Sequence, residues 1–178
     1  VSALGYALSV AIVVLTESHS AVSILAWQSA LLRITGILSV VFFAAFGISV
    51  FLGFRIPNIC TIIPVFYLIL RIICDFSAIS SLAMISDNLI LMGAYCTGLW
   101  FMLQFAKLYN GVNPKNQEKR LLAGGLASVV LCFTQSLPNI LINAFSEENY
   151  LHTSVSENLS VLFMGIFILT FIIVYFKR

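Results

Sequence analysis

Long runs of apolar residues, separated by short polar segments, recur along the whole chain. A helix needs about 20 mostly apolar residues, each adding ~1.5 Å, to cross the ~30 Å hydrocarbon core of a bilayer. Strands of a membrane barrel alternate apolar and polar positions over about ten residues, whereas these runs are unbroken. The pattern predicts an all-α bundle with six transmembrane helices. The predicted spans are residues 1–15, 34–54, 59–76, 87–106, 120–143 and 159–176.

Two parts of this pattern leave alternatives open. Residues 1–15 lack the basic start and the cleavage site of a signal peptide, so we interpret them as a span. The chain opens with Val1 rather than Met, and whether another segment precedes it stays open.

Residues 21–33 are apolar and end at Arg33; we favour a short interfacial helix anchored by Trp27 and Arg33, which suit the headgroup zone. The alternative is that residues 21–33 extend the second span, which would bring Arg33 into the membrane.

Composition supports a membrane protein and excludes other classes. Hydrophobic residues make up 61% of the 178 residues and charged residues only 9%, against about 45–50% and about 25% in soluble domains. So few charges cannot cover a soluble domain, and so many apolar residues exclude a disordered chain. A net charge of +2 provides no basic surface for nucleic acid. We therefore expect one integral membrane domain over residues 1–178, surrounded by the lipid bilayer.

Charged residues divide between the two sides that six alternating spans create. Seven of the nine Lys and Arg residues fall on the side that also holds both termini. Because Lys and Arg in short loops mark the cytoplasmic side, we predict cytoplasmic termini. The seven basic residues are Arg55, Lys107, Lys115, Lys119, Arg120, Lys177 and Arg178. The opposite side receives Glu17, Asp75, Asp87, Glu147, Glu148 and Glu157, with both histidines.

The third predicted span carries a stripe of polar residues. Tyr67, Arg71 and Asp75 lie four residues apart and so share one helix face. Because a charge within the bilayer costs a few kcal/mol, such a group is a functional hypothesis by default. One interpretation is a contact for an anion or carboxylate in a cavity open to the outside. The other is a structural ion pair between Arg71 and Asp75 that orients the helix. Both versions predict that Arg71 faces protein or water rather than lipid.

The fifth predicted span has a second stripe, formed by Gln135, Asn139 and Asn143 at the same spacing. Pro138 lies within it and removes the backbone bond to the carbonyl of Thr134, which predicts a bend. A freed carbonyl beside amide side chains can bind a polar ligand or a cation. Asn and Gln equally serve as contacts between membrane helices, and both interpretations stay open.

The sequence offers no pattern for catalysis, metal binding or a cofactor. The four cysteines form no C-x-x-C pair and fall in predicted spans, where we interpret them as small apolar side chains. There is no metal-binding histidine motif, nucleophile elbow, P-loop or dinucleotide fingerprint. Ser154 and Glu157 have the spacing of a capping box that would open the sixth helix. We therefore expect no metal or cofactor, and an enzyme is the least favoured class.

Several short segments within residues 60–140 carry a resemblance: Pro64-Val65-Phe66-Tyr67, Leu70-Arg71-Ile72-Ile73, Asp75-Phe76, Ser80-Ser81, Phe105-Ala106-Lys107 and Leu137-Pro138. They resemble uncharacterised polytopic membrane proteins of Gram-positive bacteria. This resemblance implies a multi-pass protein of the bacterial plasma membrane and no assigned activity.

A second resemblance is architectural. The chain is similar to the S components of energy-coupling-factor vitamin transporters, which have six helices, cytoplasmic termini and small residues along the first helix, as at Ala3, Ala7 and Ala11. That likeness implies solute binding by analogy of architecture alone.

Two function classes follow. The first is a small solute-binding or transport protein with an outward-opening polar site among the third to fifth helices, for a small polar or anionic solute. The second is a non-catalytic membrane subunit or regulator, whose polar stripes are helix contacts, with other subunits as partners. A cavity between the third and fifth helices would favour the first, and a packed interior the second. The candidate site residues are Tyr67, Arg71, Asp75, Gln135 and Asn139.

Overall fold

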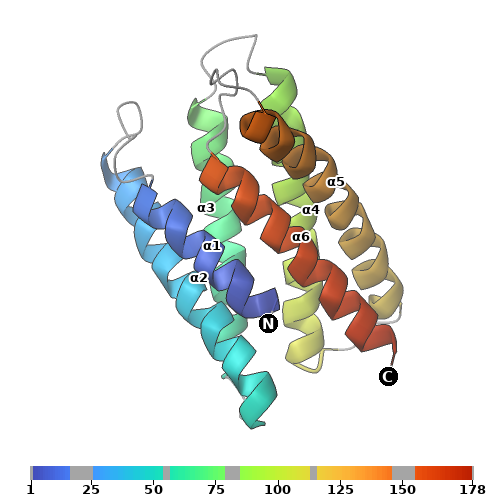
Figure 1. Cartoon of the computed structure of the whole chain (residues 1–178). Coiled ribbons are helices and arrows are strands. Elements are labelled where there is room, and N and C mark those ends of the chain that lie inside the picture. Colours follow the sequence, from blue (N-terminus) through green and yellow to red (C-terminus); the bar gives the residue numbers. More distant parts are fainter. Residues whose placement is uncertain are drawn as a thin grey trace.

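The computed structural model describes residues 2–16, 26–53, 57–78, 85–112, 116–145 and 155–177 (Figure 1). Within these ranges every regular element is a helix and no strand occurs, so the predicted all-α class is confirmed. The elements are α1 (Ser2–Thr16), α2 (Ala26–Leu52), the 3-10 helix η2 (Asn58–Ile62), α3 (Ile63–Ala78), α4 (Ile85–Tyr109), α5 (Gln117–Phe145) and α6 (Val155–Phe176).

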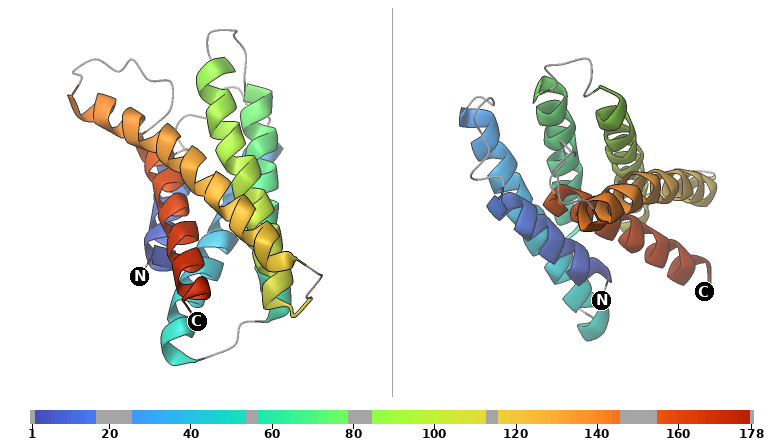
Figure 2. Two further views of the ribbon diagram at one scale, coloured as in Figure 1. Left: turned by 90° about the vertical axis from the view of Figure 1, so that its right-hand side faces the viewer. Right: turned by 45° about the horizontal axis from the view of Figure 1, so that its top comes forward.

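The six long helices form a closed ring. Each helix packs against the next one in the chain, and α1 packs against α6 to complete the circle (Figure 2). Successive helices run in opposite directions, so the start of α1 and the end of α6 lie toward the same end of the bundle (Figure 1). Short connections between antiparallel neighbours produce this up-and-down arrangement.

Five of the helices are long and apolar enough to cross a membrane, by length and composition: α2, η2 with α3, α4, α5 and α6. The chain therefore has the character of a multi-pass integral membrane protein. At 15 residues, α1 is shorter, reaching roughly 22 Å at ~1.5 Å per residue. The prediction that all six helices cross, with cytoplasmic termini, is not tested by the fold.

The prediction of a separate interfacial helix over residues 21–33 is wrong for residues 26–33, the part of this segment that the structure describes. Helix α2 runs unbroken from Ala26 to Leu52, and the Thr35 hydroxyl donates to the Leu31 carbonyl at 2.8 Å across the expected junction. Residues 21–25 lie outside the described ranges. Arg33 is half-buried within this helix. A helix can contain Arg at such a position, because the long side chain can keep its charge near the interface while its stem packs on apolar surface.

Aromatic side chains fill the interior where α1, α2, α4 and α6 approach one another. Ring centroids lie 4.6 Å apart in the pair Tyr6–Phe43 and 5.3 Å apart in Phe43–Phe167. Those of Phe105 and Phe171 are 5.1 Å apart. All three pairs are edge-to-face, a geometry that contributes about 0.5–1.5 kcal/mol beyond burial. Packing of this kind matters because lipid tails compete with apolar side chains, so hydrophobicity alone does not associate membrane helices.

Gly125 of α5 lies close to side chains of both neighbouring helices. A Cβ atom on Gly125 would lie 2.6 Å from Cδ1 of Ile172 in α6 and 3.0 Å from Cδ2 of Phe101 in α4. Small residues at such positions let membrane helices pack backbone to backbone. A larger residue at position 125 would therefore collide with side chains of α4 and α6.

Candidate functional site

Arg71 lies within α3 and faces the interior of the bundle. Its side chain is only 3% exposed, and its Nε donates to Oδ2 of Asp75, one turn later, at 3.1 Å. Its Nη2 donates to Oε1 of Glu157 in the first turn of α6. The expectation that Arg71 faces protein, and that Asp75 pairs with it, is confirmed.

The partner on α6 was not expected in this role. The sequence pattern assigned Glu157 to a capping box with Ser154, which lies outside the described residues. Glu157 reaches Arg71 across the ring, since α3 and α6 are not neighbours in it, and the capping box stays a prediction. A carboxylate in the first turn is also stabilised by the positive end of the α6 dipole.

Arg71, Asp75 and Glu157 together contain one positive and two negative side chains. One guanidinium faces two carboxylates, whose side chains are 23% exposed in Asp75 and 19% exposed in Glu157. A buried guanidinium is tolerated when carboxylates satisfy its donors, and losing its partner leaves an uncompensated charge. Because both carboxylates keep some exposure, this Arg71–Asp75–Glu157 group, here called the charged cluster, is not sealed from its surroundings.

Three tyrosines lie around the charged cluster. The guanidinium carbon of Arg71 lies 6.0 Å from the ring centroid of Tyr95 on α4, at the outer limit of a cation–π contact. Tyr67 of α3 and Tyr6 of α1 are both buried in the same core. The ring of Tyr95 therefore lies beside the guanidinium, and α4 borders the charged cluster.

The residues of the predicted stripe on α5 differ in their hydrogen bonding. Asn139 donates through Nδ2 to Oδ1 of Asn158 on α6 at 3.3 Å, a contact between helices. Gln135 is buried, and its Nε2 has no hydrogen-bond partner among the described residues. The side chain of Asn143 lies outside the described residues.

Helix α5 continues through Pro138, from Gln117 to Phe145. Proline has no amide hydrogen, so the Thr134 carbonyl lacks its usual partner at that position. The Thr134 hydroxyl is directed elsewhere, donating to the carbonyls of Val130 at 2.9 Å and Leu131 at 3.0 Å. The bend itself stays a prediction.

Consecutive residues of α6 connect the two stripes. Glu157 binds Arg71 of α3, and Asn158, which is fully buried, binds Asn139 of α5. The first turn of α6 thus bridges the two predicted stripes, whose helices α3 and α5 are not neighbours in the ring. Four of the five candidate residues have polar or electrostatic contacts within the protein: Tyr67, Arg71, Asp75 and Asn139.

Sequence reasoning missed Glu157, Asn158, Tyr95 and Tyr6 as parts of this site. The one signal in the sequence is the position of Glu157, which the alternating spans place at the same end of the bundle as Asp75. Asn158 directly follows Glu157. Among the described residues, no group of three His, Cys, Asp or Glu side chains is arranged to hold a metal ion.

No protein-family model matches the chain, and no curated protein or solved structure shows significant similarity to it.

Proposed function

We propose that this protein binds or transports a small solute and that the charged cluster is its polar site. The observation that supports the proposal is the buried guanidinium of Arg71 between two partly exposed carboxylates, inside a ring of helices apolar enough to cross a membrane. Ionisable groups inside membrane helices are costly, and they mark substrate or ion pathways in many membrane proteins.

The pairing restricts the kind of solute. An anion at Arg71 would compete with Asp75 and Glu157 for the guanidinium and would be repelled by both carboxylates. The charged cluster instead favours a cationic or neutral polar solute, which can bind the exposed parts of the two carboxylates. This replaces the anionic solute that Arg71 alone suggested.

We also propose an orientation of the helical bundle in the membrane. Four described basic residues lie at the end of the bundle opposite the charged cluster, in the last turn of α4, the first turns of α5 and just after α6: Lys107, Lys119, Arg120 and Lys177. By the positive-inside rule this end is cytoplasmic. The charged cluster would then open to the outside of a bacterial plasma membrane.

A second candidate is supported by a specific observation. The Asn139–Asn158 hydrogen bond and the Arg71–Glu157 ion pair are contacts between helices. They suit a non-catalytic membrane subunit or regulator, in which polar pairs fix the arrangement of the ring.

Thermal unfolding of the purified protein separates the two candidates. The full chain in detergent is screened against small amines, amino acids and neutral polar solutes, and then compared with Glu157→Gln. Solute binding predicts that at least one compound raises the unfolding temperature and that Glu157→Gln abolishes this rise. Glu118→Gln is the matched control, because Glu118 lies at the opposite end of the bundle in the first turn of α5.

If no compound in the screen raises the unfolding temperature, or if Glu157→Gln responds to the solute as the wild type does, the charged cluster is not a solute site. A lowered unfolding temperature in Glu157→Gln without any solute response would favour the non-catalytic subunit.

A further inference from the structure

The side chain of Gln135 on α5 contains a buried hydrogen-bond donor that no described residue accepts. Gln135 is only 4% exposed, and the donor is its Nε2. The amide nitrogens of Asn110, Gln117 and Asn139 all have acceptors, at 3.4, 3.2 and 3.3 Å. Buried donors without an acceptor are rare and costly in native proteins. The donor of Gln135 therefore points to an acceptor on a bound molecule.

Two contacts between α5 and α6 locate Gln135 relative to the charged cluster. Toward the end of the bundle that holds this cluster, Asn139 donates to Asn158. Farther along the same pair of helices, a Cβ atom on Gly165 would lie 3.0 Å from Cβ of Cys132. Gln135 lies between these contacts, one turn from Asn139 on the same face of α5. Because Asn158 directly follows the α6 member of the charged cluster, Gln135 lies about one helical turn, ~6 Å along the axis, deeper in the ring.

One face of α6 connects the charged cluster to this depth. Val161 follows Glu157 by four residues, so it lies on the same face, one turn deeper. Val161 is fully buried, whereas Glu157 is 19% exposed and Asp75 is 23% exposed. Exposure therefore decreases from the two carboxylates to Gln135. A solute that enters from this end of the ring meets the carboxylates first and Nε2 of Gln135 afterwards.

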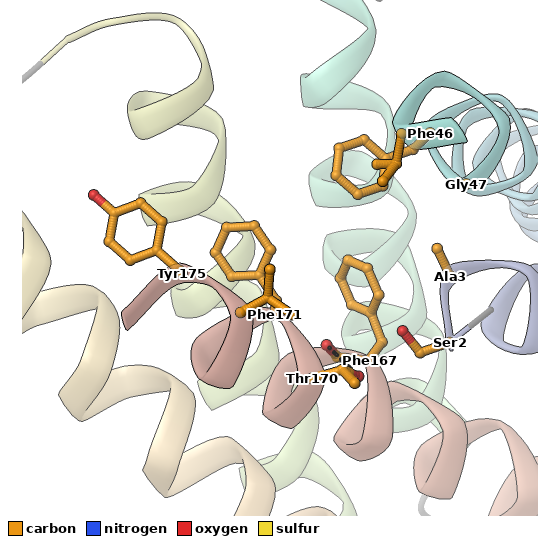
Figure 3. A pocket seen from close by; sticks show the side chains of 10 residues that line it. Ser2, Ala3, Phe46, Gly47, Phe167, Thr170, Phe171 and Tyr175 are labelled. Atoms are coloured by element: carbon orange, nitrogen blue, oxygen red, sulfur yellow. Dashed lines mark hydrogen bonds between the residues drawn. The ribbon is translucent and has the colours of Figure 1, made fainter. Parts of the chain in front are cut away.

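A cavity at the other end of the bundle is built differently (Figure 3). It has a volume of about 440 Å³ and lies between α1, α2 and α6. Aromatic, valine and alanine side chains form most of its lining, with Phe167 and Phe171 among them. The hydroxyls of Thr170 and Tyr175 donate to the Phe167 carbonyl and to Oε1 of Glu118, both at 3.3 Å. A polar solute is therefore matched better by the charged cluster and Gln135 than by this cavity.

We propose that Gln135 is a specificity-determining residue of the solute site. Its Nε2 donates to an oxygen atom of a small amine, whose positive group binds the carboxylates of Asp75 and Glu157. This inference rests on the solute-binding function proposed above. The oxygen is uncharged, as in an amide or a hydroxyl, because the charged cluster has one more negative than positive side chain and repels a carboxylate. The oxygen and the positive group of the solute are about one helical turn, ~6 Å, apart along the ring axis.

Calorimetric titration of the full chain in detergent with matched amines tests the inference. The probes are linear ω-amino amides of graded chain length and alkylamines of the same lengths, which have the same charge but no acceptor. For at least one length, wild-type protein should bind the amino amide about 2- to 10-fold more tightly, the effect of one hydrogen bond. Gln135→Met keeps the approximate side-chain size and removes the donor, so it should bind both classes equally. Gln104→Met is the matched control, because Gln104 is also 4% exposed and lies toward the opposite end, on α4.

The outcomes separate this inference from the proposed function. If amines bind and Glu157→Gln abolishes their binding, but wild-type protein prefers the amino amide at no chain length, the solute site stands and the role of Gln135 is overturned. An ordered water would then satisfy its donor. A preference that persists in Gln135→Met overturns the role as well. The wild-type comparison needs no variant, so it decides the question even if Gln135→Met does not fold. If no amine binds, the inference is wrong, and the thermal screen of neutral solutes decides the proposed function separately.

Discussion

Arg71 and Glu157 are 86 positions apart in the chain, yet Nη2 of the first donates to Oε1 of the second. This ion pair crosses the interior of the ring and joins α3 to the first turn of α6. Arg71 also pairs with Asp75, one turn later on its own helix. The Arg71–Glu157 pair therefore ties α3 to α6 through the interior of the bundle.

Replacing Arg71 should weaken the fold considerably. Arg71→Ala strands two carboxylates that are mostly buried, and breaking such a group costs about 3–5 kcal/mol. Arg71→Lys should recover part of this free energy of unfolding, because Lys keeps the charge but not the planar fork. Chemical unfolding in mixed detergent micelles measures both. Lys107→Ala, which removes an exposed charge at the opposite end, should have almost no effect. Equal stability of Arg71→Ala and wild type would contradict the assignment of the charged cluster.

The two carboxylates should be energetically coupled to Arg71. Glu157→Gln in the Arg71→Ala background should restore stability, because it removes a charge that has lost its partner. A double-mutant cycle should give a coupling of about 0.5–3 kcal/mol, as for residues in one ion-pair network. Asp75→Asn provides the parallel cycle for the pair within α3. Additive effects in both cycles would mean that the contacts contribute nothing to the fold.

The Asn139–Asn158 pair should contribute less. Hydrogen bonds between membrane helices average about 0.6 kcal/mol and reach about 1.7 kcal/mol in double-mutant cycles. Asn139→Ala should fall in that range, whereas Asn158→Ala should cost more, since Asn158 is fully buried and its replacement leaves a space. The unfolding free energies of the two single variants and the double variant measure the coupling. A cost for Asn139→Ala as large as that of Arg71→Ala would contradict this ranking.

Periodicity and hydropathy were enough to predict the helical class, because apolar runs and i, i+4 spacing are local properties of the chain. For the same reason the sequence predicted that Arg71 faces protein and that Asp75 lies one turn away. Glu157 and Asn158 were beyond this reasoning, since their partners on α3 and α5 depend on the order of helices around the ring. Local pattern also does not decide whether α2 is continuous, because a single Arg33 is compatible both with the end of a helix and with a helix that passes through the interface.

The orientation can be tested in a variant whose four cysteines are replaced by alanine. Single cysteines at Lys115 and Glu148, both outside the described residues, are labelled in whole cells with a membrane-impermeant maleimide. The segregation of basic residues predicts that position 148 reacts from outside and position 115 only after the cells are opened. The reverse pattern would place the charged cluster at the cytoplasmic end.

Pro138 provides the last prediction. Its ring removes the helical bond to the Thr134 carbonyl, and the Thr134 hydroxyl bonds to earlier carbonyls instead. Pro138→Ala restores an amide hydrogen at an exposed position, so the free energy of unfolding should rise, by up to the ~3 kcal/mol by which Ala exceeds Pro in a helix interior. If the bend at Pro138 positions Asn139 against Asn158, the variant should also lose the coupling between those two residues. Asn139→Ala would then cost less in Pro138→Ala than in wild type. An unchanged Asn139 effect together with increased stability would show that the proline bends α5 without supporting the contact.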